Sequence, residues 1–289
     1  MSETVVADFA GRFHTAETGS PEPVTGRILL SRKRLVLATD NTKTTIPLSA
    51  VIDANVGTVP GGLEAFFSDT ITVAYKQQGT NQLAIIEATG DNVERFKTVF
   101  FKVLLGGLTV IVKHPAKRGG RVTDTADEKM TLALKSGTLA LTAEGTGFTI
   151  DLGSIIDFSR EQRQLGGKTR PTLSVDHSSA GTTLTTLISL PNGRKLNLLG
   201  RFLRLEYSEI MEEVTEISVT EEQLEILVSL YSAGGSAPLK QLVTGDVNQT
   251  TIVLDRLREK GLVTDSKSAL ELTPKGQVIV SNEIEAVNT

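Results

Sequence analysis

The sequence contains no cysteine and no tryptophan, and only 4% of its residues are aromatic. The absence of cysteine excludes disulfides, thiolate metal sites and cysteine nucleophiles, and it fits a reducing cytoplasm. Hydrophobic residues make up 39% of the chain, which is enough to build packed cores. Because aromatic side chains are few, these cores must consist mainly of leucine, isoleucine and valine.

Long apolar runs are also missing. The longest run, 103–112, is interrupted by two glycines and a threonine. It falls short of the ~18–20 apolar residues that a membrane helix needs. The first residues of the chain lack the basic stretch and apolar run of a secretory signal. We therefore expect a cytoplasmic protein with no membrane insertion.

The charge balance is mildly acidic, with a net charge of −4 and a pI near 5.6. Such a surface does not attract nucleic acid over its whole extent. The chain has 289 residues. Since domains commonly contain about 100–200 residues, this length indicates two or three of them.

The strongest signal of organisation is an internal repeat. Residues 34–56 and 138–160 align without a gap at an offset of 104, with identical residues at eight aligned positions, including Asp53 and Asp157. Residues 71–79 match 173–181 more weakly, at an offset of 102. Two unrelated β-units would share alternation but not so many identities in register, so we predict a duplication.

Each copy shows alternating strand patterns and polar turns, followed by an amphipathic helical pattern at 91–105 or 199–214. About 100 residues of antiparallel strands closed by one helix are typical of a pleckstrin-homology-like barrel. We place the first repeat at 1–112 and the second at 113–217. The polar stretch 113–129 then forms the joint between them.

The remaining residues, 218–289, turn helical. Thr220 and Gln223 form a capping box at the start of a first helix, 218–234. We expect further helices at 238–245, opened by Pro238, and at 247–261, with Ile252 facing inward. Two short strands, 262–263 and 269–273, then form a wing, and a last helix covers 274–287. The sequence thus predicts an α+β fold of two tandem pleckstrin-homology-like β-barrel repeats followed by a C-terminal winged-helix domain.

A winged helix raises the question of DNA binding. Residues 219–289 hold six lysines and arginines against ten acidic residues. Phosphate contacts, made by lysine and arginine, supply most of the affinity for DNA. The first turns of helix 247–261 offer Asn248, Gln249, Thr250 and Thr251 but no basic residue. Protein docking is therefore favoured, and a winged-helix DNA-binding transcription regulator stays the alternative.

No catalytic or metal-binding pattern stands out. His14, His114 and His177 lie far apart and lack metal-ligand spacing, and the repeat-equivalent aspartates are better explained as strand ends. There is no P-loop, GxGxxG, GxSxG or HExxH motif. We therefore expect neither an enzyme nor a bound metal or cofactor. Basic clusters at 32–34 and 160–170 are candidate surfaces for an anionic partner or a membrane surface, or simply solvated turns.

Phe66 and Phe67 are adjacent aromatic residues in the loop 57–70. In a strand, neighbouring side chains point to opposite faces, so one of them is a candidate for an exposed contact residue. The alternative is a short helix, or a neighbouring domain that covers both.

The domain order and the stretches 26–39, 46–56, 255–263 and 271–280 resemble the archaeal taxis protein CheF family. The resemblance spans nearly the whole chain. It implies a cytoplasmic, non-enzymatic adaptor at the archaellum motor. Such an adaptor joins phosphorylated CheY, the chemotaxis response regulator, to the switch proteins of the archaellum.

On this resemblance, we expect CheY to dock on the C-terminal domain. The candidate contact residues are Val278, Ile279, Val280, Ile284, Arg256 and Lys260. Three consecutive apolar residues fan around a helix, so at least one of residues 278–280 should face outward. The barrels then hold the motor side and self-associate as a homodimer, through an edge strand or through Phe66 and Phe67.

Overall fold

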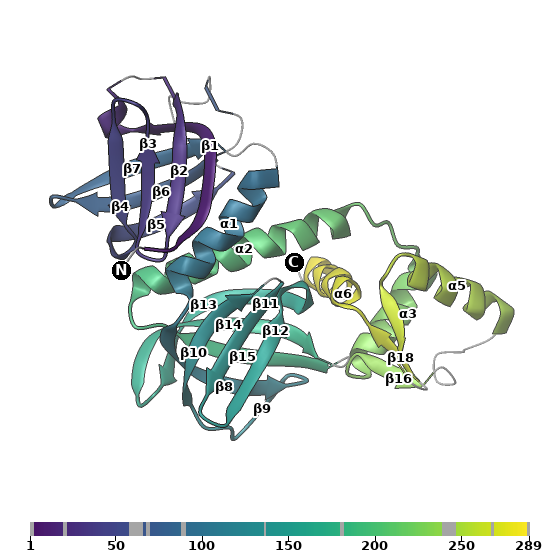
Figure 1. Ribbon diagram of the computed structural model, residues 1–289. Coiled ribbons are helices and arrows are strands. Elements are labelled where there is room, and N and C mark those ends of the chain that lie inside the picture. Colours follow the sequence, from purple (N-terminus) through teal and green to yellow (C-terminus); the bar gives the residue numbers. More distant parts are fainter. Residues whose placement is uncertain are drawn as a thin grey trace. The chain divides into compact units, whose positions relative to one another are not determined.

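The computed structural model of the protein describes residues 3–19, 22–57, 66–67, 70–87, 91–135, 137–179, 182–238, 247–266 and 269–287. Antiparallel sheets and helices combine in an α+β fold (Figure 1). The chain forms two compact units. The first comprises Met1–Leu108, Leu132–Ser136 and Asn192–Phe202, and the second comprises Thr109–Thr131, Gly137–Pro191 and Leu203–Thr289. The division into three domains at 112/113 and 217/218 stays a prediction.

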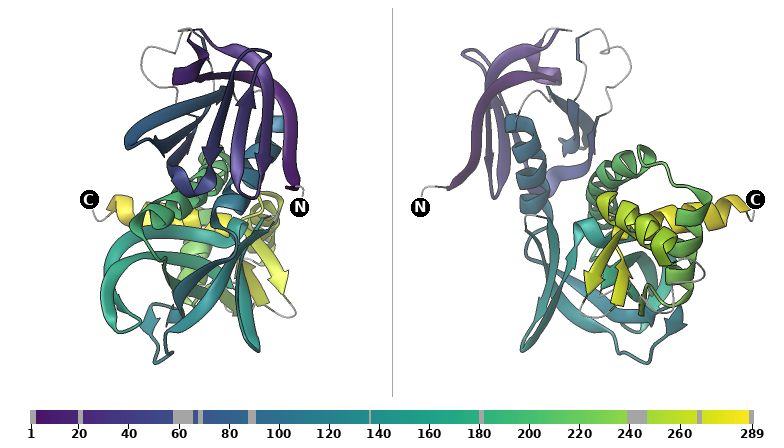
Figure 2. Two further views of the ribbon diagram at one scale, coloured as in Figure 1. Left: turned by 60° about the vertical axis from the view of Figure 1, so that its left-hand side comes forward. Right: turned by 90° about the vertical axis from the view of Figure 1, so that its right-hand side faces the viewer.

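The first sheet has seven strands in the order β4-β3-β2-β1-β7-β6-β5, and every neighbouring pair is antiparallel. The strands are β1 (Val5–Thr15), β2 (Val24–Ser31), β3 (Arg34–Ala38), β4 (Lys43–Pro47), β5 (Val51–Val56), β6 (Thr70–Gln77) and β7 (Thr80–Glu87). Helix α1 (Asp91–Leu105) follows with the bounds expected from the sequence. It lies beside the sheet (Figure 2), where Phe96 meets Phe9 of β1 edge to face at 5.2 Å.

Close approach of two strands explains one glycine of this sheet. A Cβ atom added at Gly26 of β2 would lie 2.3 Å from the carbonyl oxygen of Ala38 on β3. Backbone atoms cannot give way as a flexible side chain can. The strand pairing at this point therefore requires glycine.

We expect Gly26→Ala to lower the free energy of unfolding by about 1–3 kcal/mol, the usual cost of overpacking. Urea unfolding measures this change. Gly153→Ala is the matched control, because its added Cβ would meet only a side-chain oxygen of Asp151 at 3.3 Å. Equal stability of the two variants would contradict the steric explanation.

The second sheet has eight strands in the order β12-β11-β10-β8-β15-β14-β13, with β9 added to β8. The strands are β8 (Leu108–Arg118), β9 (Arg121–Val122), β10 (Glu128–Lys135), β11 (Thr138–Ala143), β12 (Thr146–Asp151), β13 (Ile155–Leu165), β14 (Lys168–Ser179) and β15 (Thr182–Ser189). Helix α2 (Gly193–Thr215) follows β15 as α1 follows β7.

The two sheets share one strand order, which is what a repeated unit predicts. β8 takes the central place of β1, and β10 to β15 take the places of β2 to β7. A short 3₁₀ turn recurs at Leu48–Ala50 and at Leu152–Ser154, at the same offset as the sequence repeat. The equivalent positions of the two copies therefore fall on equivalent elements.

The predicted joint at 113–129 is wrong, because β8 continues to Arg118 and β9 and β10 follow it. Val110, Val112 and Ala116 alternate inward on β8 and are buried. The lysines at 113 and 117 lie at alternate positions and are not buried, and the glycine pair forms the turn between β8 and β9. The polar composition reflects the outer face of a central strand rather than a linker.

The C-terminal region combines three helices with a three-stranded sheet in the order β16-β18-β17. Its elements are α3 (Glu221–Ser232), β16 (Ser236–Pro238), α5 (Val247–Glu259), β17 (Val263–Ser266), β18 (Ala269–Leu272) and α6 (Pro274–Val287). The capping box is confirmed: Gln223 N–H donates to Thr220 Oγ1, and Thr220 N–H donates to Gln223 Oε1. Pro238 ends a strand opposite Ala269 instead of opening a helix. Residues 239–245, the rest of that predicted helix, lie outside the described residues.

Helix α6 joins the C-terminal region to the second sheet. It packs against α3 and β18 on one side and against β13 on the other. Gln277 is almost fully buried; its amide donates to Ser178 Oγ at 2.8 Å and accepts from Thr183 Oγ1 at 3.3 Å. Ile156 of β13 belongs to the same apolar cluster as the core of the C-terminal region. Sheet and C-terminal region therefore share one core.

Candidate protein-binding surfaces

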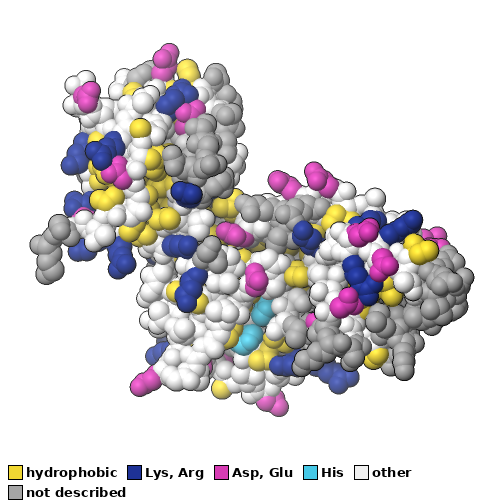
Figure 3. All heavy atoms as spheres, turned by 45° about the vertical axis from the view of Figure 1, so that its right-hand side comes forward, with side chains coloured by type: hydrophobic (Ala, Val, Ile, Leu, Met, Phe, Trp, Pro, Cys, Tyr) yellow, Lys and Arg dark blue, Asp and Glu magenta, His cyan; other side chains and the backbone are white. Residues whose placement is uncertain are grey.

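Two of the three histidines, which the sequence leaves far apart, lie together in the second sheet. The rings of His114 (β8) and His177 (β14) stack at 5.7 Å, and Phe148 stacks on His114 at 3.7 Å. Thr186 Oγ1 lies 2.7 Å from His114 Nδ1 and 3.0 Å from His177 Nε2. Figure 3 shows histidine side chains side by side at the surface (cyan).

The surroundings of both histidines favour the neutral imidazole. Burial, and to a lesser extent the charge of His114, lowers the pKa of His177 to about 4. Burial also lowers the pKa of His114. Among the residues that the structure describes, no three His, Asp or Glu side chains gather as a metal site. The ring stack with its shared hydroxyl is a polar element of the second sheet, in which His177 is buried and His114 is half-buried.

The expectation that α6 presents an apolar side chain outward is wrong for residues 278–280. Val278, Ile279 and Val280 are all buried, with at most 6% of the side chain exposed. The reason is that α6 has packing partners on two sides, α3 with β18 and β13, so it buries more than one stripe. The side chain of Ile284 lies outside the described residues.

The two cations predicted for the same surface have different environments. Lys260 Nζ donates to the carbonyl oxygen of Ser218 at 2.6 Å and to Gln223 Oε1 at 2.7 Å. It therefore helps to hold the start of α3. Arg256 is exposed on α5. Of the two, Arg256 is the residue available to a partner.

Helix α5 exposes an apolar residue that was expected inside. Val253, Leu254 and Leu257 form its buried stripe. Ile252 is 54% exposed, because it lies on the side of the helix away from that stripe. Arg256 follows it at i+4 and is its neighbour on the helix surface. The face of Ile252 and Arg256 is called the α5 face below.

Phe66 and Phe67 do not form an exposed pair. Phe67 is buried, and the guanidinium of Arg12 lies 5.9 Å from the centre of its ring. Phe66 is half-buried. Residues 58–65 and 68–69 lie outside the described residues. Phe67 is therefore excluded as an exposed contact residue, whereas the role of Phe66 in self-association stays a prediction.

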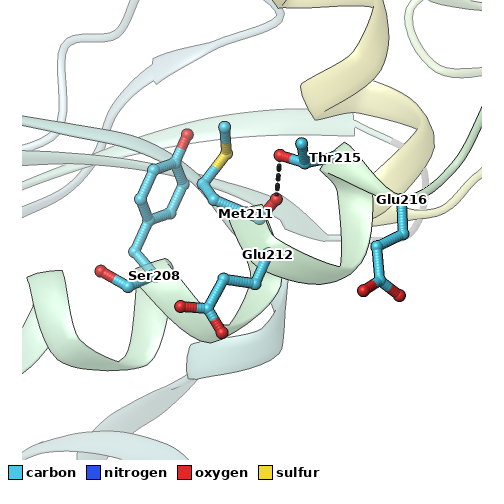
Figure 4. A pocket seen from close by; sticks show the side chains of 6 residues that line it. Ser208, Met211, Glu212, Thr215 and Glu216 are labelled. Atoms are coloured by element: carbon cyan, nitrogen blue, oxygen red, sulfur yellow. Dashed lines mark hydrogen bonds between the residues drawn. The ribbon is translucent and has the colours of Figure 1, made fainter.

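The C-terminal half of α2 carries an open groove with a volume of about 700 Å³. Its lining consists of Tyr207, Ser208, Met211, Glu212, Thr215 and Glu216. In Figure 4 the side chains of Glu212 on α2 and of Glu216, the residue after its end, lie on the same side of the chain, and the Thr215 hydroxyl donates to the Met211 carbonyl oxygen at 2.7 Å. These six residues are called the α2 groove below. Sequence analysis missed it.

Charge marks the same part of the chain. Residues 205–239 contain eight glutamates and no lysine, arginine, histidine or aspartate. This run includes the end of α2 and all of α3. It is the sequence signal by which the surface could have been found.

Nothing in the described ranges suggests a membrane span, since no helix there is both long and apolar enough to cross a bilayer.

Arg258 on α5 is engaged within the region: its guanidinium donates to both carboxylate oxygens of Asp265 at 2.9 Å and to Asp255 at 2.7 Å. The pair also removes one cation from any phosphate contact.

Comparison with known proteins gives one family match and two full-length relatives. The family described as "Archaeal Chemotaxis signal transduction system protein F" matches residues 5–209. The chain is 43% identical over 288 residues to "Taxis protein CheF2" of Halobacterium salinarum, covering 100% of both chains. It is 28% identical over 300 residues to "Taxis protein CheF1" of the same organism, covering 99% of this chain and 98% of the relative.

A solved structure of the Spt16D Pob3N heterodimer is also similar to part of the chain. It has 10% sequence identity and a TM-score of 0.25, and the match covers 67% of this chain and 99% of that one.

Proposed function

The chain belongs to the archaeal chemotaxis family of protein F, or CheF, and on this basis we propose that it is a non-enzymatic chemotaxis adaptor. It binds the phosphorylated response regulator CheY in the cytoplasm and relays the signal to the switch proteins of the archaellum motor. The observation that carries this proposal is the 43% identity to a taxis protein over the whole length of both chains.

The finer fold assignment supports such a role. We propose that each sheet with its following helix is a pleckstrin-homology-like unit and that residues 218–289 form a winged helix. The repeated strand order supports the first assignment. The succession of α3, α5, the β17–β18 hairpin and α6 supports the second. Folds of these kinds serve many functions, so the function is argued from the surfaces.

The α5 face is the proposed docking site for CheY. It replaces the three buried apolar residues of α6 as the contact surface in the C-terminal region. Ile252 supplies an apolar anchor, and Arg256 next to it supplies a charge that selects the orientation of an acidic partner surface. Both side chains come from one rigid helix, so binding does not require them to be brought together.

The relay depends on a difference in affinity. An adaptor transmits a signal only if it binds phosphorylated CheY more tightly than the unphosphorylated form. A preference of about 1–3 kcal/mol, roughly 5–150-fold, is typical of such coupling. The motor side and a homodimer contact are assigned to the two sheets. A monomeric mass in solution would contradict the homodimer.

Ile252→Glu is expected to weaken binding of activated CheY by about tenfold or more, because it places a charge at the centre of the proposed contact. Calorimetric titration with CheY of the same organism, with and without beryllofluoride as a phosphate mimic, measures this. Val122→Glu is the matched control, since Val122 is 76% exposed on β9. Equal affinity of the two variants would contradict the α5 face.

The same preparation tests the DNA-binding alternative. Affinity for DNA falls steeply with salt because bound cations are released from the phosphates. The adaptor proposal predicts no salt-dependent retention of the protein on duplex DNA. Retention, together with no binding to CheY in either state, would replace the adaptor by a winged-helix regulator.

A further inference from the structure

The geometry of the α2 groove fits a second helix. Tyr207, Met211 and Thr215 follow each other at intervals of four residues, and so do Ser208, Glu212 and Glu216. Such i±4 rows are the ridges between which a packing helix inserts its own ridge. The groove between two adjacent rows therefore has the direction and spacing that a partner helix needs.

The two rows differ in chemistry. Tyr207 and Met211 are half-buried, with the ring of Tyr207 edge to face with Phe158 at 5.8 Å. Methionine adapts its shape to different partners. Glu212 and Glu216 are exposed and are called the glutamate row below. One side of the groove thus offers apolar contact, and the other offers negative charge.

The glutamate row lies where negative charge destabilises α2 in the absence of a partner. α2 ends at Thr215 and has no basic residue in its last turn. Negative charges near the C-terminus of a helix are unfavourable, because the macrodipole is negative there. Local rules of this kind are most often broken at functional sites. A cationic partner would relieve the repulsion.

We propose that the α2 groove docks a basic amphipathic α-helix of a partner protein. The apolar side chains of that helix pack on Tyr207 and Met211. Its lysine or arginine side chains pair with the glutamate row. The surface is separate from the α5 face, so the protein presents two docking surfaces of different chemistry in its second unit.

The test uses the full chain and a fluorescein-labelled peptide of about 18 residues, patterned with leucine and lysine to form an amphipathic helix about 27 Å long. Fluorescence anisotropy measures its binding. Two control peptides carry glutamate in place of lysine, or serine in place of leucine. We expect binding of the leucine–lysine peptide, no binding of the glutamate peptide and weaker binding of the serine peptide. Equal binding of the serine peptide would overturn the apolar half of the proposal.

The matched protein variants are Glu212→Lys/Glu216→Lys and Asp124→Lys/Glu144→Lys. The second pair changes the net charge equally, at exposed residues away from α2. We expect the first pair to reduce peptide affinity by about tenfold or more and the second to leave it within about twofold, because juxtaposed like charges disfavour association. Equal losses would show general attraction to an acidic protein and would overturn the proposal, as would full binding by the first pair.

Folding is checked independently, because lysine is favourable at a helix C-terminus and the first variant should melt at or above the wild-type temperature. Titration of the same variant with activated CheY separates the two proposals. Retained CheY binding with lost peptide binding supports two surfaces. If the wild type binds the peptide but does not bind CheY in either state, the adaptor proposal is wrong, while the proposal for the α2 groove still holds.

Discussion

Replacement of Val280 by glutamate is expected to unfold the C-terminal region rather than to weaken a docking surface. Val280 has no exposed surface and belongs to an apolar cluster that includes Leu227 and Leu257. A carboxylate at this position would be desolvated among aliphatic side chains. We expect a loss on the order of 4 kcal/mol in the free energy of unfolding, beyond what most substitutions cost.

Urea unfolding followed by circular dichroism measures the loss. Asn282→Glu is the matched control, because it places the same charge on an exposed position of the same helix two residues further on. It is expected to change stability by less than about 0.5 kcal/mol. A Val280→Glu variant as stable as this control would mean that α6 is not buried on two sides.

A fall in pH from 6.5 to 4 is expected to remove about 3 kcal/mol of stability through His177 alone. The pKa of this histidine is about 4 in the folded protein, against an ordinary value of 6.5. Between these values the unfolded chain binds a proton that the folded chain does not. The free energy of unfolding therefore falls as the pH falls through this window, and well above pH 6.5, where neither state binds the proton, the histidine contributes no pH dependence.

The measurement compares urea unfolding of the wild type and His177→Gln at several pH values between 4 and 7. The difference between the two curves isolates His177. Asp176, whose pKa is raised by burial, acts in the opposite sense but is present in both proteins. Curves that stay parallel over the whole range would show that the ring is solvated in the folded state.

Local patterns in the sequence were sufficient for several helices. The amphipathic pattern of 91–105 and the capping box of Thr220 and Gln223 depend on residues within one or two turns, and both are confirmed. The CheF family resemblance is also confirmed. It depends on the residues of several stretches and not on how these stretches pack. Each of these features can be recognised from the residues of the segment itself, without knowledge of its packing partners.

Signals that depend on distant partners were not available from the sequence. The central strands β1 and β8 carry exposed polar residues on one face, so composition alone does not separate them from loops. The burial of Val278, Ile279 and Val280 depends on a second packing partner, β13, more than 100 residues earlier in the chain. Ile252 was misplaced for the complementary reason, since the pattern shows how apolar a segment is but not how many of its sides are covered.

Electrostatic features fall between these cases. The run of eight glutamates without a cation is visible in the sequence, but its meaning requires knowing that α2 ends within it. The stack of His114 and His177 requires the pairing of β8 with β15 and of β15 with β14. Strand pairing, rather than residue spacing, brings these rings together.

The packing of α6 on β13 also determines where the chain can be divided. A fragment that ended at residue 217 would leave Ile156 without its apolar neighbours and Ser178 and Thr183 without the amide of Gln277. Such a fragment would expose the surface of the second sheet that α6 covers, and it would tend to aggregate. The C-terminal region, expressed by itself, would lose the packing of β13 against its apolar core. A loss of taxis after genetic deletion of that region could therefore come from misfolding and degradation of the truncated protein instead of from the loss of a docking surface. Point substitutions on the α5 face distinguish these two causes, because they leave the shared core intact.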